Sequence, residues 1–119
     1  MIKIWVDDER PMPEGYGYHV RSTFEAIQGI TFLFEPVESD VFEGVLLDCD
    51  HDAGSEARWG GDFIKILQFY ARPEFESYFK AYMESKGEKP FKVRFHSANP
   101  VGVKNMRAIV KNCPWMEEV

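Results

Sequence analysis

The sequence predicts an α/β domain built on a mostly parallel β-sheet of about four strands flanked by helices. Short runs rich in β-branched and aromatic residues alternate with segments that repeat apolar residues at helical spacing. Elements that alternate in this way favour right-handed crossovers and a parallel sheet. Acidic clusters also follow directly on two of the apolar runs. Because ligands bind at the carboxyl ends of the strands in open sheets of this class, we expect a functional site at that edge.

Four segments have the composition of strands: Ile2–Val6, Thr31–Phe34, Val45–Leu47 and Phe91–Phe95. The run Val45–Leu47 is apolar throughout, which is typical of a strand buried on both faces, so we place it at the centre of the sheet. In Phe91–Phe95 apolar residues alternate with basic ones, which indicates a half-exposed strand at a sheet edge. After Cys113 too few residues remain for a clear fifth strand.

Helices are predicted over residues 22–29, 62–72, 75–87 and 99–113, the middle two being separate or forming one helix kinked at the proline between them. Ser22 and Glu25 have the spacing of a capping box, and Gly29 is expected to end the short helix that they open. Asn99 followed by Pro100 matches an N-cap with proline at the first helical position. The aromatic residues of the middle segments repeat at helical spacing and are expected to pack in the core.

Length, charge and cysteine content limit the classes of function. The 119 residues suffice for one domain with a substantial core, so we treat 1–119 as a single domain. The formal net charge of −6 argues against nonspecific DNA binding, and a phosphorylated ligand would need a bridging metal or a local basic patch. Cys49 and Cys113 suggest neither a disulfide framework nor a zinc–thiolate site. The sequence shows no signal peptide and no membrane-spanning run, so we expect a cytoplasmic protein.

Two acidic clusters stand at the ends of predicted strands. Asp7 and Asp8 follow the first strand, and Asp48, Asp50 and Asp52 follow the central one at alternate positions. Like charges so close together repel, which favours a site where carboxylates bind a ligand or titrate. A solvent-exposed turn is the alternative explanation for the first pair. Carboxylates are typical ligands of Mg²⁺ or Mn²⁺, and each of the three later aspartates is a candidate third ligand.

Other polar residues near these strand ends suit phosphate chemistry. Because an imidazole with an unperturbed pKa titrates near neutrality, histidines suit proton transfer, and His51 and His96 are the candidates here, although a lone histidine is more often structural. Ser97 and Asn99 either cap the last helix or bind phosphate at its amino end, and both functions are compatible. Arg10 adjoins the first acidic pair and is the first candidate for a phosphate contact.

Three segments of the chain carry a resemblance to a known family: Ile4–Pro11, Asp50–Gly54 and His96–Gly102. Through them the sequence resembles the receiver-like domains described as cyclic-phosphate-processing receivers, nearly from end to end. The acidic pair in the first segment is common to many receivers. The third segment, in its order and spacing relative to the second, is the specific one.

The resemblance implies a flavodoxin-like receiver fold of three layers with strand order 2-1-3-4. It also implies a bound Mg²⁺ or Mn²⁺ ion and the processing of a cyclic phosphate ester, such as a cyclic nucleotide or an RNA cyclic-phosphate end. The implied metal ligands are Asp7, Asp8 and Asp50. On this basis catalytic roles are predicted for His51, His96, Asp52 and Ser97.

The chain departs from ordinary signalling receivers in two respects. Its loop from Gly54 to Gly61 is longer and the segment from Pro73 to Pro90 adds a helix, so the site would have different walls. The other departure concerns the last strand of ordinary receivers. Those domains end in a fifth strand that carries a lysine for the phosphoryl group, and no such strand is expected here. This difference disfavours a role in phosphorelay. Two alternatives to an enzyme remain: a phosphoacceptor receiver domain in signalling, and a non-catalytic module that binds a phosphorylated ligand. The expected partner is a small phosphorylated ligand or an RNA end, and no membrane partner is expected.

Overall fold

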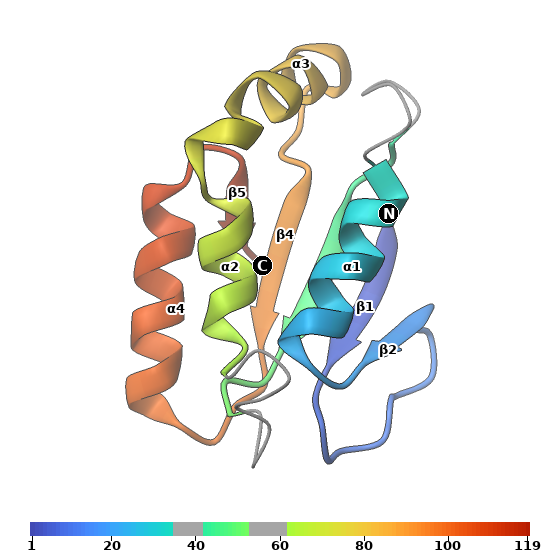
Figure 1. The fold of residues 1–119 in the computed structure, drawn as a ribbon, viewed down its shortest axis with the longest axis vertical. Coiled ribbons are helices and arrows are strands. Elements are labelled where there is room, and N and C mark those ends of the chain that lie inside the picture. The colour runs from blue at the N-terminus through green and yellow to red at the C-terminus, as the bar shows by residue number, and fades with distance from the viewer. Residues whose placement is uncertain (35–41, 53–61) are drawn as a thin grey trace.

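A computed structural model of the chain describes residues 1–34, 42–52 and 62–119 (Figure 1). In sequence order the elements are β1 (Ile2–Val6), β2 (Tyr18–Val20), α1 (Thr23–Phe34), β3 (Val45–Cys49), α2 (Ile64–Tyr70), the 3₁₀ turn η2 (Pro73–Phe75), α3 (Glu76–Lys86), β4 (Phe91–Phe95), α4 (Pro100–Asn112) and β5 (Met116–Glu118). None of the helices in these ranges is long and apolar enough to cross a membrane. Cys49 and Cys113 are both free and buried.

The sheet has five strands in the order β2-β1-β3-β4-β5, and every neighbouring pair is parallel. The α/β class and the central position of β3, whose residues are all buried, are confirmed. The prediction that no fifth strand follows Cys113 is wrong, since Met116 pairs with Phe91 and places β4 inside the sheet rather than at its edge. Trp115 explains how so short a strand is held, because its indole nitrogen donates to the Tyr70 carbonyl at 2.8 Å inside the core.

The second strand is not where the sequence placed it. Thr31–Phe34 forms the last turn of α1, and Tyr18–Val20 is the strand that pairs with β1. The Ser22 hydroxyl accepts the Glu25 backbone N–H as expected for an N-cap, but the helix continues through Gly29. A stripe of apolar side chains at helical spacing, Ala26, Ile30 and Phe34, is buried against the sheet. This burial outweighs the local β preference of the last turn.

The described helices cover one face of the sheet. In Figure 1, α1, α2 and α4 lie next to one another in front of the strands, and α2 contacts both of the others. The core contains Ile4, Leu47 and Val93, whose side chains share the helix-covered face, whereas Trp5 and Leu46 alternate with them and point to the opposite face. Among the described residues the fold therefore has two layers instead of the three expected, because the β1–β2 connection contains no helix.

Of the remaining helices, α3 and α4 follow their sequence signals closely, whereas α2 is shorter than predicted and has no side-chain cap at its start. Separate helices lie on either side of the Pro73 turn, and α3 ends at Gly87, whose φ of 71° is the left-handed conformation typical of a glycine C-cap. Phe79 and Tyr82 of α3 are buried, which confirms the aromatic stripe as core. Asn99 caps α4 by accepting the Gly102 backbone N–H at 2.9 Å, with proline at the first helical position. The carboxyl ends of the strands and the start of α4 thus meet at one edge of the molecule (Figure 1).

Candidate functional site

The carboxyl ends of β1, β3 and β4 bring the predicted site residues together. The Asp50 backbone N–H donates to the Val6 carbonyl at 2.9 Å, and the His96 N–H donates to the Cys49 carbonyl at 3.0 Å. These bonds continue the parallel ladders by one residue beyond the strands. The acidic pair, the central aspartates and His96 therefore share one edge, as predicted.

Asp7, Asp8 and Asp50 form an acidic triad at this edge. Each of them offers a carboxylate oxygen within 4.8 Å of the others. Burial raises the pKa of Asp8, and the negative charges of Glu9, Asp7 and Asp50 raise it further. A site of crowded hard oxygen ligands with uncompensated charge fits Mg²⁺ or Mn²⁺, so the residues present suit the ion that the sequence implies.

Asp7 is the member of the acidic triad whose charge is already compensated. One of its oxygens accepts the backbone N–H groups of Glu9 and Arg10, both at 2.8 Å, and the other lies 2.8 Å from His96 Nε2. Burial of this fully enclosed carboxylate would raise its pKa, but these donors outweigh burial and the pKa is lowered. The Arg10 guanidinium lies 3.8 Å from Asp7 and donates to the His96 carbonyl.

His96 is held on both ring nitrogens. Its Nδ1 lies 2.7 Å from an Asp48 oxygen and its Nε2 lies 2.8 Å from Asp7, so each nitrogen must donate to a carboxylate. The ring also stacks on Trp5, with 3.9 Å between centroids and 5° between planes. Burial would lower the pKa of His96, but Asp48 and Asp7 outweigh it and the pKa is raised. The two carboxylates therefore favour the protonated, cationic form of His96.

Asp48 is linked to the acidic triad through the His96 ring, whose other nitrogen contacts Asp7. The residue is 4% exposed, and its carboxylate accepts hydrogen bonds from His96 and from the Tyr16 hydroxyl. Burial would raise the pKa of Asp48, but these partners lower it. Strand alternation could have predicted the orientation of Asp48, because it places Leu47 and Cys49 on the core face and Asp48 on the opposite face. Nothing in the sequence pointed to Tyr16 as its partner.

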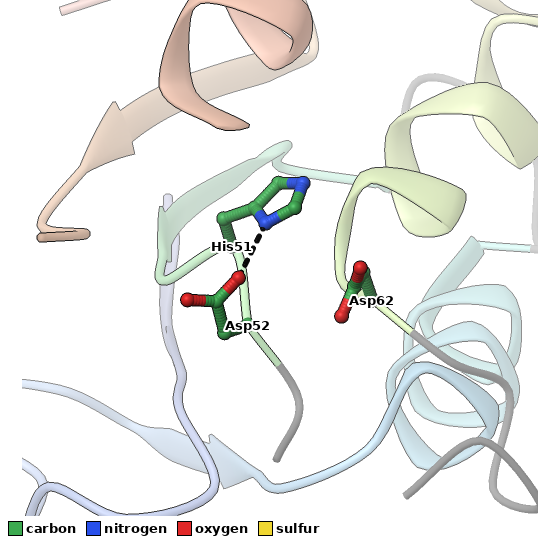
Figure 2. Close-up of side chains that lie close together, drawn as sticks. All are labelled: His51, Asp52 and Asp62. Carbon is green, nitrogen blue, oxygen red and sulfur yellow. Dashed lines mark hydrogen bonds and ion pairs between the residues drawn. The ribbon is translucent and has the colours of Figure 1, made fainter. Parts of the chain in front are cut away.

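His51 and Asp52 form a second polar cluster, with Asn99 and Asp62 beside it. His51 Nδ1 lies 2.7 Å from Asp52 Oδ1, and the Asn99 amide donates to the same oxygen at 3.1 Å. Figure 2 shows the other ring nitrogen of His51 turned away from Asp52. His51, Asp52 and Asp62 also offer ligand atoms within 4.8 Å of one another, although exposed acidic groups are common without a bound ion. The His51 backbone N–H donates to Asp50, which joins this cluster to the acidic triad.

The residues predicted to contact phosphate lie around this edge, but they differ in how far existing hydrogen bonds already engage their side chains. Ser97 accepts the Asn99 backbone N–H at 3.1 Å, so its hydroxyl supports the turn before α4. Asn99 caps α4 with its oxygen and reaches Asp52 with its amide group. Arg10 is 46% exposed at its side chain, which leaves part of the guanidinium open to a ligand.

The parallel sheet with acidic residues at the carboxyl ends of its central strands defines a receiver-like α/β domain. Comparison with family models gives a match to the cyclic-phosphate processing Receiver domain over residues 2–112. The chain belongs to this family. No curated protein and no solved structure gives a significant match to the chain.

Proposed function

We propose that the protein is a metal-dependent enzyme that opens or hydrolyses a cyclic phosphate ester. The observation that carries this proposal is the His51–Asp52 pair joined to the acidic triad through Asp50. An ion-binding group of carboxylates next to an oriented imidazole is what phosphate ester hydrolysis requires. Membership of the family supports the substrate class.

In this proposal His51 is the proton-transfer residue. Asp52 accepts a hydrogen bond from His51 Nδ1–H, which keeps the proton on Nδ1 and leaves Nε2 to take a proton from the attacking water. Water oxygen then bonds to phosphorus, one ring P–O bond breaks, and the proton passes to the leaving ester oxygen, so that a phosphomonoester is formed. Mg²⁺ or Mn²⁺ held by the acidic triad would polarise a phosphoryl oxygen.

The other predicted site residues take supporting roles. His96 neutralises Asp7 and Asp48 and is proposed as a positioning residue, because both of its nitrogens are engaged. The amino end of α4 offers the positive end of the helix dipole to an anion beside Asn99. Arg10 is the proposed side-chain contact to the phosphate.

The test is hydrolysis of 2′,3′-cyclic and 3′,5′-cyclic nucleotides, with and without EDTA. We expect activity that EDTA removes, that Asp50→Asn lowers and that added Mn²⁺ partly restores, since mass action offsets weaker binding. His51→Gln should lower kcat by about 10²–10⁴, as loss of a proton-transfer group does, without recovery at high metal. Glu84→Gln, at an exposed position of α3, is the matched control and should behave as wild type. Activity that survives EDTA, or that His51→Gln leaves intact, would exclude the mechanism.

A phosphoacceptor domain is the second candidate, because Asp50 follows the central strand and lies in the acidic triad. Incubation with acetyl phosphate and Mg²⁺, followed by intact mass measurement, separates the two functions. A phosphoryl adduct that Asp50→Asn abolishes would favour signalling. Binding of a cyclic nucleotide without adduct or turnover would favour a binding module.

A further inference from the structure

The ring of His51 lies against a glycine in the first turn of α4. A Cβ atom built on Gly102 would lie 2.3 Å from Cγ of His51, 2.6 Å from Cδ2 and 2.7 Å from Nδ1. Real Cβ atoms essentially never approach other heavy atoms so closely. Any side chain at position 102 would therefore occupy the space of the imidazole.

The backbone itself does not require glycine at this position. Gly15, Gly44 and Gly87 are the described glycines with positive φ, and Gly102 is not among them. Its N–H donates to the Asn99 side chain, a bond that any residue except proline would keep. Alanine is also the better helix former. The absence of a side chain is thus the property of Gly102 that the neighbouring His51 ring requires.

The His51 ring has little freedom to move away. The backbone of His51 is held on both sides, since its N–H donates to Asp50 at 2.8 Å and its carbonyl accepts the Phe63 N–H at 2.9 Å. The nearest ring atom to the added Cβ is Cγ, which moves chiefly by rotation about χ1. Such a rotation would carry Nδ1 away from Asp52, to which it is now bonded at 2.7 Å (Figure 2).

We propose that Gly102 is a positioning residue that seats the His51 ring for proton transfer. The proposal rests on the proposed function of His51 and extends it to the first turn of α4. That turn acts on the His51–Asp52 pair twice: Gly102 leaves room for the ring, and Asn99 donates to Asp52. A first turn that served only to stabilise the helix would need neither the space for the His51 ring nor the bond from Asn99 to Asp52.

The test compares Gly102→Ala with Gly29→Ala, a second helical glycine around which nothing lies within 4 Å. Gly29→Ala should raise Tm and leave kcat unchanged, because alanine stabilises an open helical position. Gly102→Ala should lower kcat on a cyclic nucleotide by about 10²-fold, as misplacement of a reacting group by about 1 Å does. KM and Mn²⁺ affinity by calorimetry should stay within about twofold of wild type, since the acidic triad is untouched. The ¹⁵N shifts of the His51 ring should change.

Wild-type kcat and unchanged His51 shifts in Gly102→Ala would overturn the proposal. If Gly102→Ala folds poorly, the His51→Ala/Gly102→Ala double variant decides, because removal of the ring should restore much of the lost Tm. A double variant no more stable than Gly102→Ala would also refute the proposal that Gly102 positions the His51 ring. If wild type turns over no cyclic phosphate, the proposed function fails, while the ring shifts and the double variant still decide whether Gly102 sets the position of His51.

Discussion

The carboxylates of Asp7 and Asp8 are neighbours in sequence but lie in opposite electrostatic surroundings. Asp7 receives two backbone N–H groups and His96, whereas the pKa of Asp8 is raised by burial and by nearby acids. Without metal, Asp8→Asn should therefore raise stability slightly, because it relieves repulsion, and Asp7→Asn should lower it by about 1–3 kcal/mol through unsatisfied buried donors. Urea unfolding in EDTA measures both changes.

Metal binding gives the complementary outcome for Asp8→Asn. Calorimetry should show markedly weaker Mn²⁺ binding by this variant than by wild type, because a charged ligand is lost from the acidic triad. Unchanged Mn²⁺ affinity together with lower stability in EDTA would contradict the electrostatic account.

The two site histidines should differ in what their removal does to the fold. His96 lies between the buried carboxylates of Asp7 and Asp48, and its loss would leave both without their cation. We expect His96→Ala to cost about 3–5 kcal/mol, which is typical when one partner of a buried ion pair is removed. His51→Ala should cost less, because Asp52 is exposed and still receives the Asn99 amide.

Chemical denaturation of both histidine variants at neutral pH makes the comparison. Tryptophan fluorescence provides an internal probe, since the Trp5 ring stacks on His96 and its share of the emission should respond to His96→Ala. Equal losses of stability in the two variants would contradict the cationic role of His96 between Asp7 and Asp48.

At the scale of elements, the attachment of β5 should depend on pH. The Arg107 guanidinium of α4 donates to Glu118 of β5 through two bonds, at 2.6 and 2.8 Å, and holds the pKa of Glu118 below its ordinary value. A lowered carboxyl pKa contributes stability above the unfolded-state value and loses it as pH falls through the folded value. The protection factor of the Val119 N–H, which is bonded to the Val93 carbonyl, should therefore fall as the pH drops below the ordinary glutamate pKa.

The matched control for this pH effect is Glu118→Gln. It should lower the protection factor of the Val119 N–H at neutral pH and should remove most of the further loss of protection on acidification. A protection factor whose pH response is the same in Glu118→Gln and in wild type would show that the Arg107 pair does not hold β5.

At the scale of the whole molecule, the helices and the continuous core lie on one face of the sheet. Leu47 and Leu46 are adjacent in β3 and almost equally buried, but only Leu47 belongs to the core cluster. Leu47→Ala should cost about 2–5 kcal/mol, the usual range for a buried leucine. Leu46→Ala should cost less than half of that, because no described helix packs over it. Urea unfolding of the two variants tests this asymmetry, and equal costs would argue against a one-sided core.

Local chemistry explains why much of the fold and site was predictable. Asn99 and Pro100 mark the start of α4 through capping and a preset φ, which need no distant partner. Likewise, the acidic triad follows from carboxylates placed directly after buried parallel strands, whose ends must share an edge. The apolar run of β3 predicted its central place, since few residues other than apolar ones tolerate burial on both faces.

The tertiary structure alone decided the short strands and the partners of single side chains. Tyr18–Val20 and Met116–Glu118 are too short to carry a periodic pattern, so their pairing with neighbours, and not their own composition, makes them strands. The role of His96 depended on Asp48 turning away from the core, and the close fit of Gly102 to His51 depended on where α4 begins relative to β3. The sequence therefore determined which groups gather at the strand ends, because that follows from local pattern, whereas folding determined which of them touch, because contact depends on distances between segments remote in the chain.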